Sequence, residues 1–193
     1  MENNQIIVSA EEQFAREVTL GVIVQKPPSV WLTLIPGMFI IDFLRRSRAI
    51  RLYTKRFMFP RTLALETGQA ILQGQDKAPI NSQSEVEIEN WLNSLNLYSQ
   101  DLAQAQKTTV DLLTDHYAKL LRAKGNTYYD LIKNAYKQRE DYEEHINRLS
   151  AAEREVDRAI IAKLGENEKL RKKFQAEEQQ VEMRRKKIIE EVF

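Results

Sequence analysis

Cysteine is absent from this 193-residue sequence, and histidine occurs only twice, at His116 and His145. Without cysteine the chain has no disulfide, no thiolate metal ligand and no cysteine nucleophile. The Glu-x-x-His pattern of di-iron helical bundles is also missing, because residues 113 and 142 are Leu and Tyr. Phosphate-binding glycine loops and nucleophile elbows are absent too. The sequence therefore predicts a non-enzymatic protein without metal, cofactor or recognisable small-molecule substrate.

Proline and glycine become scarce after residue 80. All five prolines and four of the six glycines precede residue 81, and residues 74–84, GQDKAPINSQS, have the composition of a connector. We therefore place a domain boundary here, between an N-terminal helical segment, residues 1–80, and a coiled-coil helical hairpin, residues 81–193.

Apolar residues in the second segment recur with helical spacing, which predicts an all-α fold built on a long antiparallel hairpin. Ser82 with Glu85, or Ser84 with Glu87, would cap the first helix. That helix would end at Gly125-Asn126, whose residues tolerate a left-handed backbone.

The second helix of the hairpin carries a heptad-like apolar stripe. We expect the stripe to mediate helix–helix interaction through Leu149, Val156, Ile160, Leu170, Phe174, Val181 and Ile188. Polar residues interrupt it at Glu153, Lys163, Asn167, Glu177 and Arg184. Its phase continues through Gly165, which favours one long helix, with a three-helix bundle broken at Leu164-Gly165 as the alternative. The stripe would pack on the N-terminal segment, on a second copy or on a partner helix.

The two histidines have ordinary structural interpretations. His116 lies on the apolar seam of the first helix, where we expect a hydrogen-bonded core residue. His145 follows Asp141 by four positions, which predicts a pair on one helix face. Four tyrosines between residues 128 and 142 should pack the end of the hairpin.

The N-terminal segment contains a strongly apolar run. A short helix capped by Ser9 and Glu12 should end before Gly21. Residues 30–44, VWLTLIPGMFIIDFL, then include a single ionisable side chain, Asp42. As a helix the run would rise about 22 Å, short of the roughly 30 Å hydrocarbon core of a bilayer. Pro36-Gly37 would bend it, which predicts insertion at a membrane surface by Trp31, Leu34, Ile35, Pro36, Gly37, Phe39, Ile40 and Phe43.

Basic residues follow the apolar run directly, with no acidic residue between Asp42 and Glu66. Such a cluster attracts anionic lipid headgroups, by about 1 kcal/mol per residue near the surface. We expect an anionic surface to be bound by Arg45, Arg46, Arg48, Arg51, Lys55, Arg56 and Arg61.

Together these features predict a scaffold or interaction protein at the cytoplasmic, inner face of a membrane, anchored by residues 30–61 and recruiting partners through its coiled coil. The first alternative is a soluble accessory subunit of a larger complex in which residues 30–61 are core. The second is nucleic-acid binding through residues 45–61, which the neighbouring apolar run disfavours.

Overall fold

The computed structural model describes residues 2–24, 38–166 and 168–193, with the side chains of residues 23, 24, 38–49, 52 and 77 left out of the description. The described residues are all-α, as predicted, and form seven helices: α1 (Glu2–Val24), α2 (Met38–Leu72), α3 (Lys77–Ser94), α4 (Gln100–Arg122), α5 (Tyr128–Tyr136), α6 (Arg139–Leu164) and α7 (Glu168–Val192).

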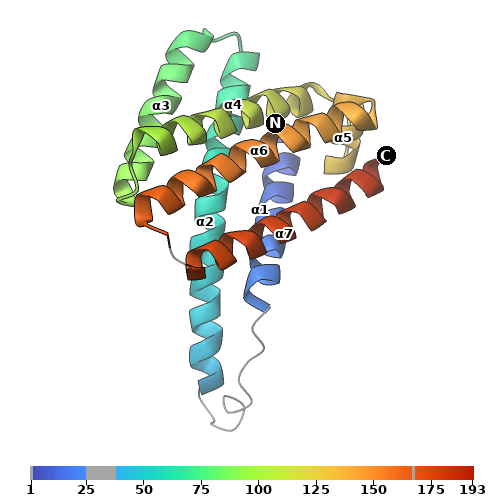
Figure 1. Ribbon diagram of the computed structural model, residues 1–193. Helices are drawn as coiled ribbons and strands as arrows, with labels where there is room; N and C mark the ends of the chain where they lie inside the picture. Colours follow the sequence, from blue (N-terminus) through green and yellow to red (C-terminus); the bar gives the residue numbers. More distant parts are fainter. Residues whose placement is uncertain (1, 25–37, 167) are drawn as a thin grey trace.

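Helix α2 is the longest of the described helices and packs against α1, α3 and α4. Helices α4 and α6 run side by side across α2, and α7 returns below them toward α5 (Figure 1). Helix α1 lies beside α2 and also contacts α7. The N-terminal part of α2 projects past α7, away from the remaining helices (Figure 1).

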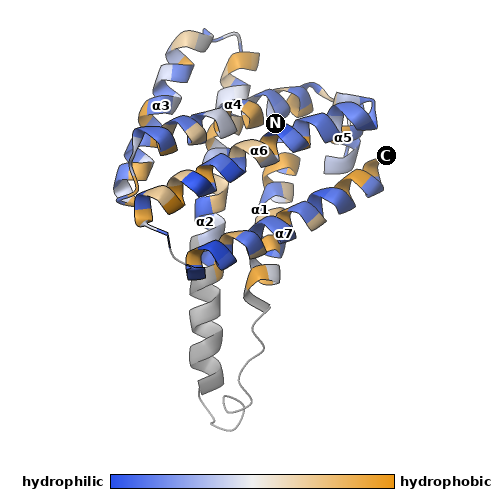
Figure 2. Ribbon diagram, viewed as in Figure 1, coloured by the Kyte–Doolittle hydropathy of each residue, from blue (hydrophilic) through white to orange (hydrophobic). Residues whose placement is uncertain are grey.

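One hydrophobic core joins both segments of the chain. It includes Ile7 of α1 and Leu63 of α2 together with Leu113 of α4 and Ile189 of α7. The helices of this body carry both hydrophobic and hydrophilic residues (Figure 2), which is the composition of helices that bury one face. The connector predicted over residues 74–84 includes part of the turn between α2 and α3 and the first turns of α3.

Helix α1 is longer than predicted at both ends. It begins at Glu2, so Ser9 lies inside the helix and does not cap it. It also continues through Gly21 to Val24. A Cβ atom on Gly21 would lie 2.0 Å from Oε1 of Gln180, so the missing side chain leaves room for α7.

The predicted first helix of the hairpin is two helices. Helix α3 begins after Asp76, and the Ser82 and Ser84 hydroxyls bond to carbonyl groups four residues earlier instead of capping. The chain then breaks at Asn96, whose φ of 57° is a left-handed conformation that Asn tolerates. Ser99 caps α4 by accepting a hydrogen bond from the Leu102 amide at 3.3 Å.

The turn between α4 and α5 lies where the sequence predicts a helix end, but for a different reason. Gly125 and Asn126 do not have positive φ. A Cβ atom on Gly125 would instead lie 2.5 Å from Cβ of Asp130, so glycine is needed for close packing. Thr127 and Asp130 form a reciprocal capping box that starts α5.

The helix predicted to continue through Gly165 is broken there. Gly165 has a φ of 82°, which only glycine adopts readily, and α6 ends at Leu164. Helix α7 therefore folds back and packs on α1, α5 and α6. The three-helix alternative places this break correctly.

Candidate functional site

The projecting N-terminal part of α2, residues 38–56, is here called the arm, and it carries some of the residues predicted to bind a membrane. The predicted insertion residues Trp31, Leu34, Ile35, Pro36 and Gly37 lie outside the described residues. Phe39, Ile40, Phe43, Arg45, Arg46 and Arg48 belong to the helical arm, but their side chains are not described. The structure thus brings these six residues onto one projecting helix.

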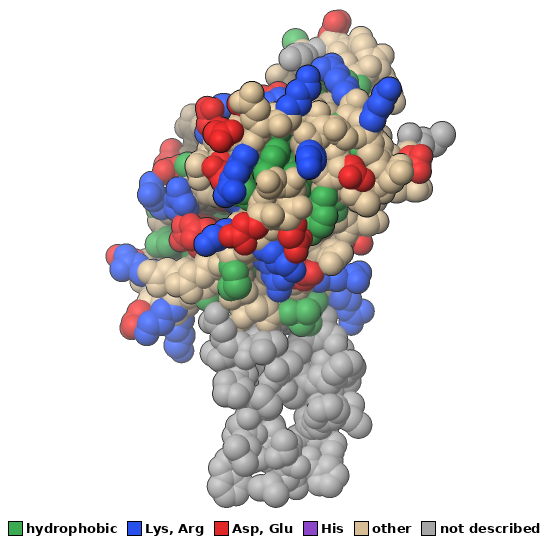
Figure 3. All heavy atoms as spheres, turned by 90° about the vertical axis from the view of Figure 1, so that its right-hand side faces the viewer, with side chains coloured by type: hydrophobic (Ala, Val, Ile, Leu, Met, Phe, Trp, Pro, Cys, Tyr) green, Lys and Arg blue, Asp and Glu red, His purple; other side chains and the backbone are tan. Residues whose placement is uncertain are grey.

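Three of the predicted cations are exposed where the arm meets the body. Arg51, Lys55 and Arg56 are solvent-exposed on α2. None of the three forms an ion pair with a carboxylate in the described part of the chain. On the face of the body shown in Figure 3, by contrast, basic and acidic side chains are interspersed. Unpaired cations at this position suit an anionic surface.

Arg61 lies in the interior, which differs from its predicted role at an anionic surface. Its side chain is 5% exposed and its guanidinium contacts two carboxylates, Glu11 at 2.9 Å and Glu153 at 3.1 Å. The same guanidinium lies 3.5 Å from the centre of the Phe57 ring. Burial lowers the pKa of Arg61, but the two carboxylates outweigh burial and raise it above its ordinary value. Arg61 is therefore a structural cation.

Glu153 continues this buried ionic network to α7. Its carboxylate accepts hydrogen bonds from Arg185 at 2.8 and 3.0 Å, and Arg185 also donates to Ser150 at 2.7 Å. Burial raises the pKa of Glu153, and the charges of Arg185 and Arg61 lower it further than burial raises it, so it stays ionised. The ionic network of Glu11, Arg61, Glu153 and Arg185 ties α1, α2, α6 and α7 together.

The predicted interaction stripe faces the inside of the chain. Leu149 and Val181 are buried, and Val156, Ile160, Leu170, Phe174 and Ile188 are partly buried. Leu149 and Ile188 line one cavity between the helices, and the other five line a second cavity. Because Gly165 folds α7 back, the stripe packs within the chain instead of forming an outward seam.

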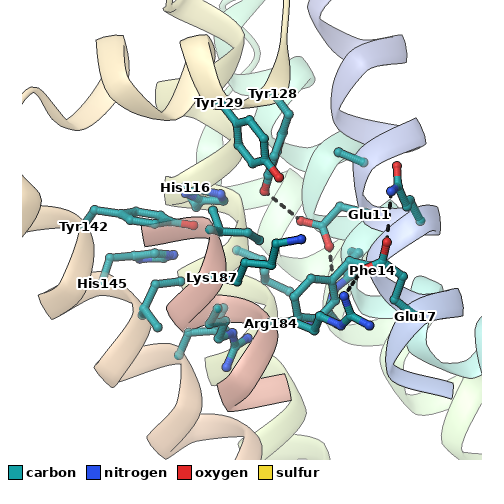
Figure 4. A pocket seen from close by; sticks show the side chains of 18 of the residues that line it. Glu11, Phe14, Glu17, His116, Tyr128, Tyr129, Tyr142, His145, Arg184 and Lys187 are labelled. Atoms are coloured by element: carbon teal, nitrogen blue, oxygen red, sulfur yellow. Dashed lines mark hydrogen bonds and ion pairs between the residues drawn. The ribbon is translucent and has the colours of Figure 1, made fainter. Parts of the chain in front are cut away.

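The first cavity, here called the histidine cavity, has a volume of about 420 Å³. Figure 4 shows the side chains that converge on it from α1, α4, α5, α6 and α7, among them Glu11, Phe14, His116, Tyr128, Tyr142, His145 and Lys187. Its lining combines aromatic and apolar side chains with charged ones, and most of the charged groups are paired. Tyr128 donates to Glu11 at 3.2 Å, and Arg184 pairs with Glu17 at 2.8 Å.

Both histidines of the chain meet in this cavity. Their rings stack with centroids 4.7 Å apart. His116 is a hydrogen-bonded core residue, as predicted, with Nδ1 2.7 Å from the Tyr136 hydroxyl. His145 stacks on His116, and no described contact pairs it with Asp141, so the predicted pair on one helix face is wrong. Burial lowers the pKa of His116 and brings that of His145 to about 4, so both rings are neutral at pH 7.

The second cavity, here called the carboxylate cavity, has a volume of about 280 Å³ and is lined by residues of α2, α3, α4, α6 and α7. Asp157 in its wall has no ion-pair partner among the described cations. Burial, followed by the negative charges of Glu177, Glu153 and Glu178, raises the pKa of Asp157 to about 8. Burial also raises the pKa of Glu177. Asp157 is therefore largely protonated at neutral pH.

In the described part of the chain, no three His, Asp or Glu side chains are grouped to hold a metal ion. The ionic network, the histidine stack and the unpaired Asp157 did not follow from the sequence. Polar Glu153 and Glu177 at stripe positions were the available signal for the ionic network and for the unpaired Asp157.

Among the described residues, no helix combines the length and apolar character needed to cross a bilayer. Neither protein-family models nor curated proteins nor solved structures match this chain.

Proposed function

We propose that the protein is a non-enzymatic membrane-surface protein. It attaches to anionic lipid through residues 30–56, which comprise the apolar run and the arm of α2, and it presents its helical body to partners. The observation that carries this proposal is the unpaired, exposed group of Arg51, Lys55 and Arg56 at the base of a projecting helix. Partners would meet the body, because the apolar stripe is occupied within the chain.

The anchoring segment is shorter than the sequence alone predicts. Phe57 stacks on Phe14 of α1 with centroids 5.8 Å apart, and Phe59 stacks on Trp91 of α3 at 4.3 Å. Residues 57–61 therefore belong to the body. The soluble-subunit alternative expects the same of the whole segment, residues 30–61. The proposed anchor is residues 30–56.

Charge reversal at the base of the arm tests this proposal. Attraction of about 1 kcal/mol per basic residue means that three neutralised cations weaken binding about 100-fold, and reversal weakens it at least as much. We expect the purified chain to float with anionic vesicles at low salt, and the triple variant Arg51→Glu, Lys55→Glu, Arg56→Glu to remain in the unbound fraction.

The matched control reverses the charge of three exposed cations that lie near the N-terminal end of α1. These are Arg122, Lys124 and Lys133. Asn3 at the start of α1 donates to the carbonyl of Ala123 at 2.8 Å, which places this group far from the arm. The control variant should float like the parent. Equal losses in both variants would mean that only total charge matters, and a parent that never floats would favour the soluble-subunit alternative.

A further inference from the structure

The histidine cavity has the dimensions and walls of a site for a small molecule. Its volume of about 420 Å³ lies within the range of ligand pockets, roughly 300–1,000 Å³. Phe14, Tyr128 and Tyr142 supply aromatic surface from three different helices (Figure 4). Aromatic side chains beside charged groups can hold an organic ligand that carries a polar or charged group.

Both carboxylates in the wall are already neutralised. Glu11 accepts hydrogen bonds from Arg61 and Tyr128, one on each oxygen. Glu17 pairs with Arg184 through one oxygen and accepts from Gln13 at 3.0 Å through the other. Neither carboxylate therefore remains available for a cationic ligand.

Lys187 is the cation of the cavity that no wall carboxylate neutralises. Arg61 and Arg185 belong to the ionic network, and Arg184 pairs with Glu17. The one ion pair of Lys187 among the described residues is with Glu191 at 3.5 Å, and both side chains are largely exposed. Because exposed ion pairs contribute little to stability, the anionic group of a ligand can replace Glu191 as the partner of Lys187.

Two buried polar atoms of the cavity residues lack a hydrogen-bond partner in the described part of the chain: Nε2 of His145 and Nε of Arg184. Buried polar atoms are nearly always hydrogen-bonded, and these two have less than 1 Å² of accessible surface, so a ligand satisfies them once the two side chains turn toward the cavity. A neutral imidazole and a guanidinium N–H can both donate to the oxygen of an anion.

From these observations we propose that the histidine cavity binds a small organic anion, with its flat apolar body against Phe14, Tyr128 and Tyr142 and its anionic group at Lys187, Arg184 and His145. This site is separate from the arm and does not depend on attachment to a membrane.

Titration with 1-naphthoate tests the proposal, with 1-naphthamide as its uncharged counterpart. We expect calorimetry to show binding of the naphthoate at least tenfold tighter than that of the amide, because a charge-assisted hydrogen bond contributes about 1.5–3 kcal/mol. The chain has two histidines, so a proton–carbon spectrum of their Cε1 groups contains two signals, assigned with a His145→Gln variant. The His145 signal should move as naphthoate binds.

Lys187→Gln should weaken naphthoate binding about tenfold, because it removes the cation that meets the anionic group. Lys186→Gln is the matched control, since Lys186 is the neighbouring residue on α7, is 79% exposed and does not line the cavity. Absence of naphthoate binding, equal affinity for the amide, equal effects of the two substitutions, or binding that leaves the His145 signal in place would each overturn the proposal.

Discussion

Replacing Arg61 with Met should lower the free energy of unfolding by about 3–5 kcal/mol, the range for removing one partner from a buried ion pair. The Arg61 side chain is 5% exposed and is the only described cation within ion-pair distance of Glu11. Without it, Glu11 keeps the hydrogen bond from Tyr128 but loses its counter-charge inside the protein. Denaturant unfolding followed by circular dichroism measures the change.

Removing the stranded carboxylate as well tests whether the two charges act as a pair. In the double variant Arg61→Met, Glu11→Gln, we expect destabilisation smaller than the sum of the two single variants, because residues in one network are not additive. Arg158→Met is the control, since Arg158 is exposed and pairs with Glu155 on the surface of α6. If Arg61→Met were as mild as this control, within about 0.5 kcal/mol of the parent, the buried network would not hold the helices together.

Replacing Asp157 with Asn should stabilise the protein above pH 8. The folded chain holds the Asp157 proton up to about pH 8, whereas the unfolded chain releases it near its ordinary pKa of 3.8. The folded state therefore binds more protons between these values, and the parent loses stability as the pH rises through this window. The difference in pKa sets an upper limit of about 6 kcal/mol, and partial exposure reduces the expected gain to about 3 kcal/mol.

The pH profile of this gain is the diagnostic measurement. The difference in unfolding free energy between Asp157→Asn and the parent should grow from pH 5 to pH 8 and then stay constant. Glu144→Gln is the control, because Glu144 is an exposed residue of α6 without an ion pair in the described structure. Its effect should be small at every pH. A gain for Asp157→Asn that is absent, or equal at pH 5 and pH 8.5, would show that Asp157 is not held protonated.

Helical periodicity was sufficient to predict the all-α class and the core position of His116. The helix end near residue 125 was predicted instead from the residue types of Gly125 and Asn126, which tolerate a left-handed backbone. Periodicity failed at Asn96 and Gly165 because the spacing of apolar residues continues across both. The backbone at each adopts positive φ, which apolar spacing does not report.

Long-range pairing was the part of the site that the sequence could not supply. Arg61 continues a run of basic residues that reads as one surface cluster, yet its partners lie 50 and 92 positions away in the chain. His145 lies near Asp141 in sequence but stacks on His116, because the α4 and α6 helices are neighbours. Glu153 and Glu177 interrupt the apolar stripe, and such interruptions now indicate polar groups inside the bundle.

The most direct test of membrane attachment uses the two tryptophans of the chain, Trp31 in the proposed anchor and Trp91 in the body, where it stacks on Phe59. A Trp91→Phe variant keeps an aromatic ring at that position and leaves Trp31 as the sole tryptophan. We predict that its fluorescence shifts to shorter wavelength with anionic vesicles and is quenched by lipids brominated in their acyl chains, whereas a Trp31→Phe variant is not quenched. Trp31 fluorescence that neither shifts nor is quenched would contradict attachment through this segment.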